Sequence, residues 1–128
     1  MKKSIPWIIL YIYCFLIFFY SSESAPGKSL GIQSFVISNS IYIHILEYFI
    51  LTLLIYFALH STLKKRIVLP SFLFAVLFSL SDEVHQLFVP GRFYSYGDIV
   101  ADAFGSLLFI SINYLYHENP HRVSHSRL

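Results

Sequence analysis

The sequence has few charged residues, with nine basic and seven acidic side chains among 128 positions. Its net charge is only +2, and no basic stretch of the kind that binds nucleic acid is present. It has a single cysteine, Cys14, so no disulfide can form within the chain. We also find no internal repeat, the feature from which many transporters are built. These absences argue against nucleic acid binding and weaken the case for transport.

Apolar residues are abundant, at 56% of the chain. A soluble domain of this size keeps too large a surface to hide so many of them. A helix that spans a bilayer needs about 20 largely apolar residues. We therefore predict an all-α polytopic membrane protein with the bilayer as its partner. The predicted domain covers residues 1–116, with transmembrane helices at about 5–21, 41–60, 67–87 and 98–116, and a polar cytoplasmic tail follows at 117–128.

The basic residues predict the topology, because cytoplasmic loops of membrane proteins are enriched in lysine and arginine. With both termini inside, seven of the nine basic residues are cytoplasmic, and only Lys28 and Arg92 lie outside. We therefore predict an N-in, C-in protein. The first apolar segment also resembles a signal peptide that would be cleaved after Ala25. Its apolar run is long for that role, and we favour a retained helix.

Four of the seven acidic residues lie within residues 81–102. In the N-in topology, three stripes of polar residues reach the outer end of the second, third and fourth helices. Ionisable groups at membrane depth are costly and usually face the bundle interior or a wet cavity. The helical spacing therefore predicts one outward-facing pocket, lined by His44, Glu47, Tyr48, Asp82, Glu83, Gln86, Asp98 and Asp102.

Several of these residues have alternative interpretations. Asp98 can cap the fourth helix through its side chain, and Glu47 can form a buried pair with His44 or Arg92. His85 can point to lipid headgroups. Arg92 follows Pro90-Gly91, which favours a type II turn that would aim the arginine at the acids. There it would either neutralise them or hold a phosphate or carboxylate in a bidentate fashion.

The spaced motif in this region is D-E-x-x-Q-x-x-x-P-x-R, followed after five residues by D-x-x-x-[ND]-x-x-G. The second helix adds H-x-x-x-Y, and a serine pair follows the first. These residues are Asp82, Glu83, Gln86, Pro90, Arg92, Asp98, Asp102, Gly105, His44, Tyr48, Ser21 and Ser22. The chain, up to about residue 116, resembles the VanZ-like family of small bacterial membrane proteins, named for a teicoplanin-resistance determinant.

The resemblance implies a role in the bacterial cell envelope, a place in the cytoplasmic membrane and glycopeptide resistance in some members. It implies no established reaction. This sequence departs from the family pattern at two places. Asp102 stands where many members have asparagine, and the lysine that often precedes the helix-two histidine is absent from Ser38-Asn39-Ser40.

Three functions remain open. The first is an enzyme acting on a lipid-linked or phosphorylated envelope substrate, with Arg92 on a phosphate, Glu83 or Asp82 as general base and His44 or His85 moving protons. The same carboxylates could hold Mg²⁺, Ca²⁺ or Mn²⁺. The second is a non-catalytic protein that binds a lipid headgroup, a cell-wall precursor or a glycopeptide. The third is an ion-coupled transporter.

Overall fold

The computed structural model describes residues 3–25, 27–28, 30–63 and 65–117, and within these ranges every regular element is a helix. The helices are α1 (Ser4–Ser21), α2 (Gln33–Ser38), α3 (Ser40–Thr62), α4 (Val68–Gln86) and α5 (Tyr96–His117). All but α2 are long and apolar enough to span a membrane. The predicted all-α fold with four membrane-spanning helices is therefore confirmed. Of the tail predicted at 117–128, His117 is the last residue of α5 and the rest lies outside the described residues.

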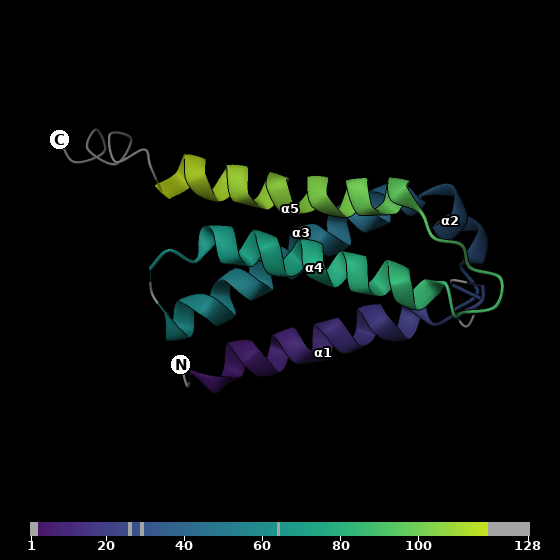
Figure 1. Cartoon of the computed structure of the whole chain (residues 1–128), viewed down its shortest axis with the longest axis horizontal. Coiled ribbons are helices and arrows are strands. Elements are labelled where there is room, and N and C mark those ends of the chain that lie inside the picture. Colours follow the sequence, from purple (N-terminus) through teal and green to yellow (C-terminus); the bar gives the residue numbers. More distant parts are fainter. Residues whose placement is uncertain (1–2, 26, 29, 64, 118–128) are drawn as a thin grey trace.

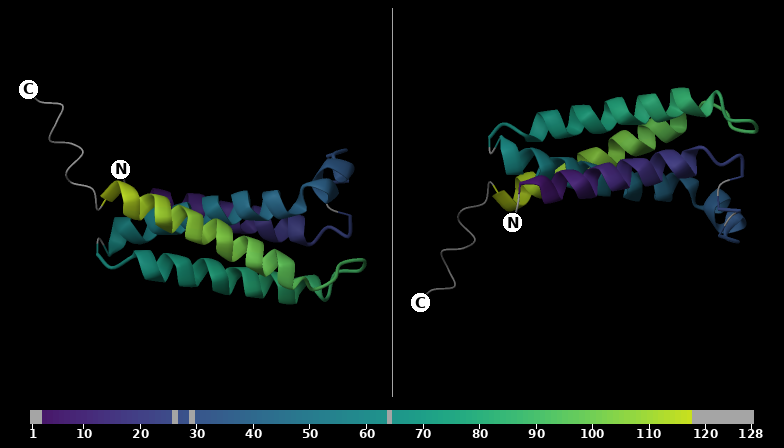
Figure 2. Two further views of the ribbon diagram at one scale, coloured as in Figure 1. Left: turned by 90° about the horizontal axis from the view of Figure 1, so that it is seen from above. Right: turned by 90° about the horizontal axis from the view of Figure 1, so that it is seen from below.

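The four long helices form a bundle around α3, which packs against α1, α4 and α5, most extensively against α5. Helix α1 begins and α5 ends at the same end of the bundle as the connection between α3 and α4 (Figure 1). Helix α2 and the loop between α4 and α5 both lie at the opposite end, on different sides of it, as the two views of Figure 2 show. We call this opposite end the α2 end.

The bundle places apolar side chains outside and several polar ones inside. Large apolar residues on the long helices are exposed, among them Phe15, Leu69 and Leu77. An outer surface of this kind suits contact with lipid, while the backbone polar groups are satisfied within each helix. Inside, an apolar core of Leu10, Leu51, Ile55, Ala58, Leu59, Ile67 and Ala75 fills the middle of the bundle and the half away from the α2 end.

Close approach of α5 to α3 depends on one glycine. A Cβ atom added to Gly105 would overlap the backbone carbonyl of Ile45 on α3. Ala101, one turn earlier on α5, is also buried. Small residues at such positions let membrane helices pack backbone to backbone. This contact brings the polar stripes of α3 and α5 together at the α2 end.

Candidate functional site

A histidine between two aspartates connects α3 to α5. Nδ1 of His44 lies 2.8 Å from Oδ1 of Asp102, which is only 2% exposed. Its other ring nitrogen, Nε2, lies 3.6 Å from Oδ2 of Asp98. From α4, the hydroxyl of Ser79 donates a hydrogen bond to the second oxygen of Asp102. Asp102 thus fixes the histidine ring, leaving Nε2 on the side of Asp98.

A second network folds the α4–α5 loop back onto the end of α4. The amide of Gln86 donates to Oδ2 of Asp82 at 3.2 Å, and Nε of Arg92 donates to Oε1 of Gln86 at 3.3 Å. A hydrogen bond from Arg92 N–H to the Val89 carbonyl, at 3.1 Å, closes the turn, with Gly91 at φ +82°. This geometry matches the predicted type II turn. Among the described residues, Arg92 is bonded to an amide and forms no ion pair with a carboxylate.

The start of α5 is held by Glu83 and Ser95. The buried carboxylate of Glu83 accepts a hydrogen bond from the backbone N–H of Ser95 at 2.8 Å. The hydroxyl of Ser95 in turn accepts one from the N–H of Asp98 at 3.1 Å. Because α5 begins at Tyr96, its capping side chain is Ser95 and not Asp98. The carboxylate of Asp98 is therefore available to face His44.

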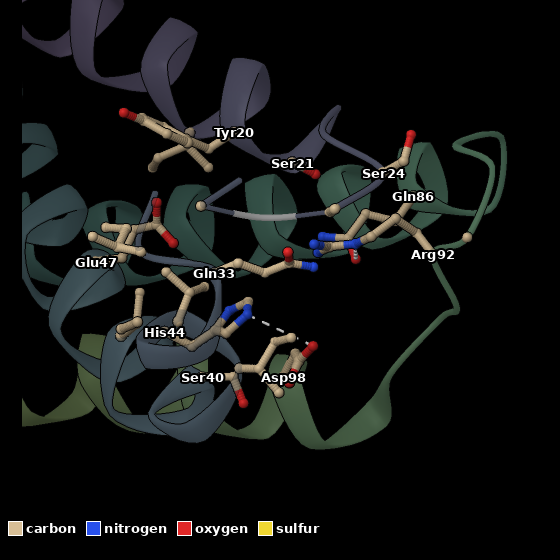
Figure 3. A pocket seen from close by; sticks show the side chains of 18 of the residues that line it. Tyr20, Ser21, Ser24, Gln33, Ser40, His44, Glu47, Gln86, Arg92 and Asp98 are labelled. Carbon is tan, nitrogen blue, oxygen red and sulfur yellow. Dashed lines mark hydrogen bonds and ion pairs between the residues drawn. The ribbon is translucent and has the colours of Figure 1, made fainter. Parts of the chain in front are cut away.

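A cavity of about 610 Å³ opens beside these networks at the α2 end. Its polar lining includes Ser21, Ser24, Gln33, Ser40, His44, Glu47, Asp82, Gln86, Arg92 and Asp98. Its apolar lining comes mainly from α1 and the segment that includes α2, with Ile17, Tyr20, Leu30, Ile32, Phe35, Val36 and Ile37. Figure 3 shows Glu47 and Arg92 on opposite sides of the cavity, with Gln33 and His44 between them. The site can accommodate a molecule with both polar and apolar parts.

Six of the ten predicted site residues line this cavity: His44, Glu47, Asp82, Gln86, Arg92 and Asp98. The other four do not. Asp102 lies behind the lining and supports His44, and Glu83 supports the start of α5 in the same way. Tyr48 is 1% exposed and lies within the core. His85 is directed elsewhere, because its Nε2 lies 3.0 Å from the Ser22 hydroxyl and its ring stacks on Phe18 at 4.1 Å.

Some buried polar atoms make no well-formed hydrogen bond among the described residues. Two of them, Oγ of Ser21 and Oδ1 of Asp82, belong to side chains that line the cavity and interact with each other without a well-formed hydrogen bond. The others are the Tyr48 hydroxyl and Oε1 of Glu83. Native proteins leave few buried polar atoms unpaired, so such atoms beside a cavity are suited to a ligand. Within the described residues, no group of three or more His, Cys, Asp or Glu side chains is arranged to hold a metal ion.

Several contributors were missed by the sequence analysis, and Ser79 and Gln33 illustrate two different reasons. Ser79 lies seven residues before Gln86 and three before Asp82, so it belongs to the same stripe of α4, and that spacing would have revealed it. Gln33 comes from α2, and its amide points toward Arg92 in Figure 3. No periodicity in a six-residue helix indicates such a role, because the tertiary fold alone brings α2 over the cavity.

A helical bundle with four membrane-spanning segments and a charged cavity at one end defines a polytopic membrane protein with a polar site. The VanZ/LLP1 family model matches residues 7–117, most of the chain, and the protein belongs to this family. No curated protein and no solved structure gave a significant match.

Proposed function

We propose that this VanZ-family protein acts in the bacterial cell envelope, where its cavity binds the polar end of a lipid-linked or phosphorylated substrate. The observation that carries the proposal is the composition of the cavity wall. One side offers Arg92, Gln86 and His44, and the other is an apolar surface from α1 and α2. An amphiphile with a phosphate satisfies both sides at once, because arginine binds phosphate through a planar fork of N–H donors.

Within this proposal, His44 is the group best arranged to move a proton. It lines the cavity, whereas Glu83 is committed to the start of α5. Asp102 is a positioning residue, since its bond to Nδ1 orients the ring and leaves Nε2 for chemistry beside Asp98. The same cavity would serve a protein that only binds its ligand, and the experiments below distinguish the two cases.

The proposed topology places the cavity in the outer half of the cytoplasmic membrane, as the distribution of basic residues favours. Single cysteines replacing Lys28 and Lys65 in a Cys14→Ser background test this placement. We expect a membrane-impermeant maleimide to label Lys28→Cys in intact cells and Lys65→Cys only after lysis. The opposite labelling pattern would show that the cavity faces the cytoplasm and would rule out a site in the outer leaflet.

The principal test is mass spectrometry of lipids that copurify with the protein. Arg92→Ala should lose a lipid or lipid-linked phosphate that the wild type retains. Lys28→Ala is the matched control, because Lys28 is exposed, does not line the cavity and carries the same charge on the same predicted side. If the two variants retain the same lipids as the wild type, Arg92 does not anchor a ligand.

Family membership also supports a role in resistance to glycopeptides such as teicoplanin. Expression in a susceptible bacterium should raise the inhibitory concentration of teicoplanin, and Arg92→Ala should abolish the rise. His44→Asn then separates catalysis from binding. If this variant keeps the copurified lipid but loses resistance, His44 acts in a reaction. If it keeps both, the protein acts by binding alone.

A further inference from the structure

The cavity carries an acidic and a basic side chain that the protein does not pair with each other. Glu47 projects from α3 and Arg92 from the loop after α4, on opposite sides of the cavity (Figure 3). Among the described residues, no ion pair forms with either of them. A ligand that enters this cavity therefore meets an acidic side chain on one side and a basic one on the other.

The carboxylate of Glu47 has no hydrogen-bond partner among the described residues, although it lies two turns inside a membrane-spanning helix. The nearest basic group on the same helix is His44, which is already held between Asp102 and Asp98. An isolated carboxylate at this depth is costly unless a positive charge or donor accompanies it. Glu47 is therefore suited to a cationic group of a ligand.

A second acceptor lies in the cavity wall. Oδ1 of Asp82 makes no well-formed hydrogen bond among the described residues, although the Ser21 hydroxyl interacts with this carboxylate, and Asp82 is only 7% exposed. Its other oxygen accepts the bond from Gln86, so the side chain is fixed in place. An ionised carboxylate accepts hydrogen bonds and donates none, and an ammonium group supplies three donors. Glu47 and Asp82 thus both call for N–H donors.

The side of the cavity opposite Glu47, where Arg92 lies, is suited to an anion. Arg92 uses its Nε for the bond to Gln86, and none of its terminal amino groups forms a hydrogen bond within the described residues. The amide of Gln33 points toward the same guanidinium in Figure 3. Such a fork binds the oxygens of a phosphate in a bidentate manner.

From this arrangement we propose that the ligand is a zwitterionic amphiphile whose polar end carries both a phosphate and an ammonium group. The phosphate binds at Arg92, the ammonium at Glu47 and Asp82, and the hydrocarbon part lies against the apolar wall formed by Tyr20, Phe35 and Ile37. This inference rests on the proposed function and narrows its substrate class from any phosphorylated lipid to one with a positive charge beside the phosphate.

The test compares two lipids with identical tails and one phosphate each, phosphatidylethanolamine and phosphatidylglycerol, by native mass spectrometry of the full-length protein in detergent. Only the first carries an ammonium group. We expect the wild type to bind it about tenfold more tightly, the effect of one charge-assisted hydrogen bond. Glu47→Gln should remove this preference and leave binding of phosphatidylglycerol unchanged, which also shows that the variant is folded.

Further arms separate the parts of the inference. Arg92→Ala should weaken both lipids, and the Lys28→Ala control neither. Free phosphoethanolamine should bind at least a hundredfold more weakly than the lipid, because it lacks the tails. Equal binding of the two would contradict the proposal that the ligand is an amphiphile. The proposal of a zwitterionic ligand would be contradicted if the wild type did not prefer phosphatidylethanolamine over phosphatidylglycerol. It would also be contradicted if the Glu47→Gln variant kept that preference. If an Arg92-dependent copurified lipid then remains, the proposed function stands without this inference.

Discussion

The two halves of the bundle are held together in different ways. The half near the α3–α4 connection contains an apolar core that includes Leu51, Ile55 and Ala58. The half at the α2 end is crossed by hydrogen bonds between helices, from Ser79 and His44 to Asp102. In a bilayer, helices associate through close packing and through interhelical hydrogen bonds, because lipid tails are as apolar as leucine. Interhelical hydrogen bonds between side chains concentrate at the α2 end, beside the close contact of Gly105 with Ile45, whereas the other half relies mainly on its apolar core and has one bond from Ser61 to the Lys3 carbonyl.

The comparison also separates stability from function. The buried polar side-chain atoms left unpaired among the described residues lie mostly at the α2 end, with Oδ1 of Asp82, Oγ of Ser21 and Oε1 of Glu83, and the Tyr48 hydroxyl in the core is the remaining one. Local rules that a fold breaks in one region usually mark its functional site. Under the proposed function, the α2 end gives up some stability to keep its cavity open for a ligand. Four predictions on the free energy of unfolding, measured by denaturant titration in detergent, test this division.

The largest effect is expected at the contact that joins α3 to α5. Gly105→Val places a side chain against the Ile45 backbone. Backbone atoms of a packed helix cannot move aside as the end of a flexible side chain can. We expect a loss of about 3 kcal/mol or more and a chain that elutes largely aggregated. Gly97→Ala is the control, because its added Cβ meets only the Ser95 hydroxyl at an ordinary 3.5 Å. A well-folded Gly105→Val variant would contradict the close approach.

The next effect concerns the buried ion pair. Asp102→Leu leaves His44 and Ser79 without their shared partner, and we expect a loss of about 3 kcal/mol. Asp98→Leu should lose under about 1 kcal/mol, since Asp98 is 22% exposed and 3.6 Å from the ring. Adding His44→Leu to Asp102→Leu should recover much of the loss, because no buried imidazole is left without its carboxylate and only the neutral Ser79 hydroxyl stays unpaired. Equal losses of stability in Asp102→Leu and Asp98→Leu would mean that the deeper burial of Asp102 does not make its contact with His44 stronger.

The apolar half should respond to lost packing. Leu51→Ala removes a side chain that is 0% exposed, and we expect a loss of about 2 kcal/mol with the cavity left unchanged for ligand binding. Leu46→Ala on the same helix is the control, because Leu46 is 60% exposed toward the outside. If Leu51→Ala abolished ligand binding while the protein stayed folded, the two halves would not be separable.

The smallest effect is expected for Ser79→Ala, which deletes the hydroxyl that donates to Asp102. Interhelical hydrogen bonds in membranes contribute about 0.6 kcal/mol on average, and we expect a loss of that order. In the control, Ser111→Ala, the deleted hydroxyl bonds only a carbonyl of its own helix. A loss above about 2 kcal/mol would show that Ser79 does more than complete the pair.

The helices and the membrane class could be predicted from the sequence, because long apolar runs have few alternatives to spanning a bilayer. The polar stripes of α3, α4 and α5 could also be placed at one end, because consecutive spanning helices run in opposite directions. The partners within that end could not be predicted, since His44 had Glu47 one turn away yet bonds Asp102, 58 positions along the chain. The direction of His85 toward Ser22 depends likewise on how α1 docks.

The cavity wall and the charged network belong to different stretches of the chain. The apolar wall is largely supplied by residues 17–37, whereas the groups that bind charge come from α3, α4 and the loop before α5. Changes in the first stretch can therefore reshape the space for hydrocarbon and leave the His44–Asp102 pair intact. If the cavity binds the proposed lipid, this separation allows evolution, or an engineer, to change the preferred tails while the polar contacts stay the same.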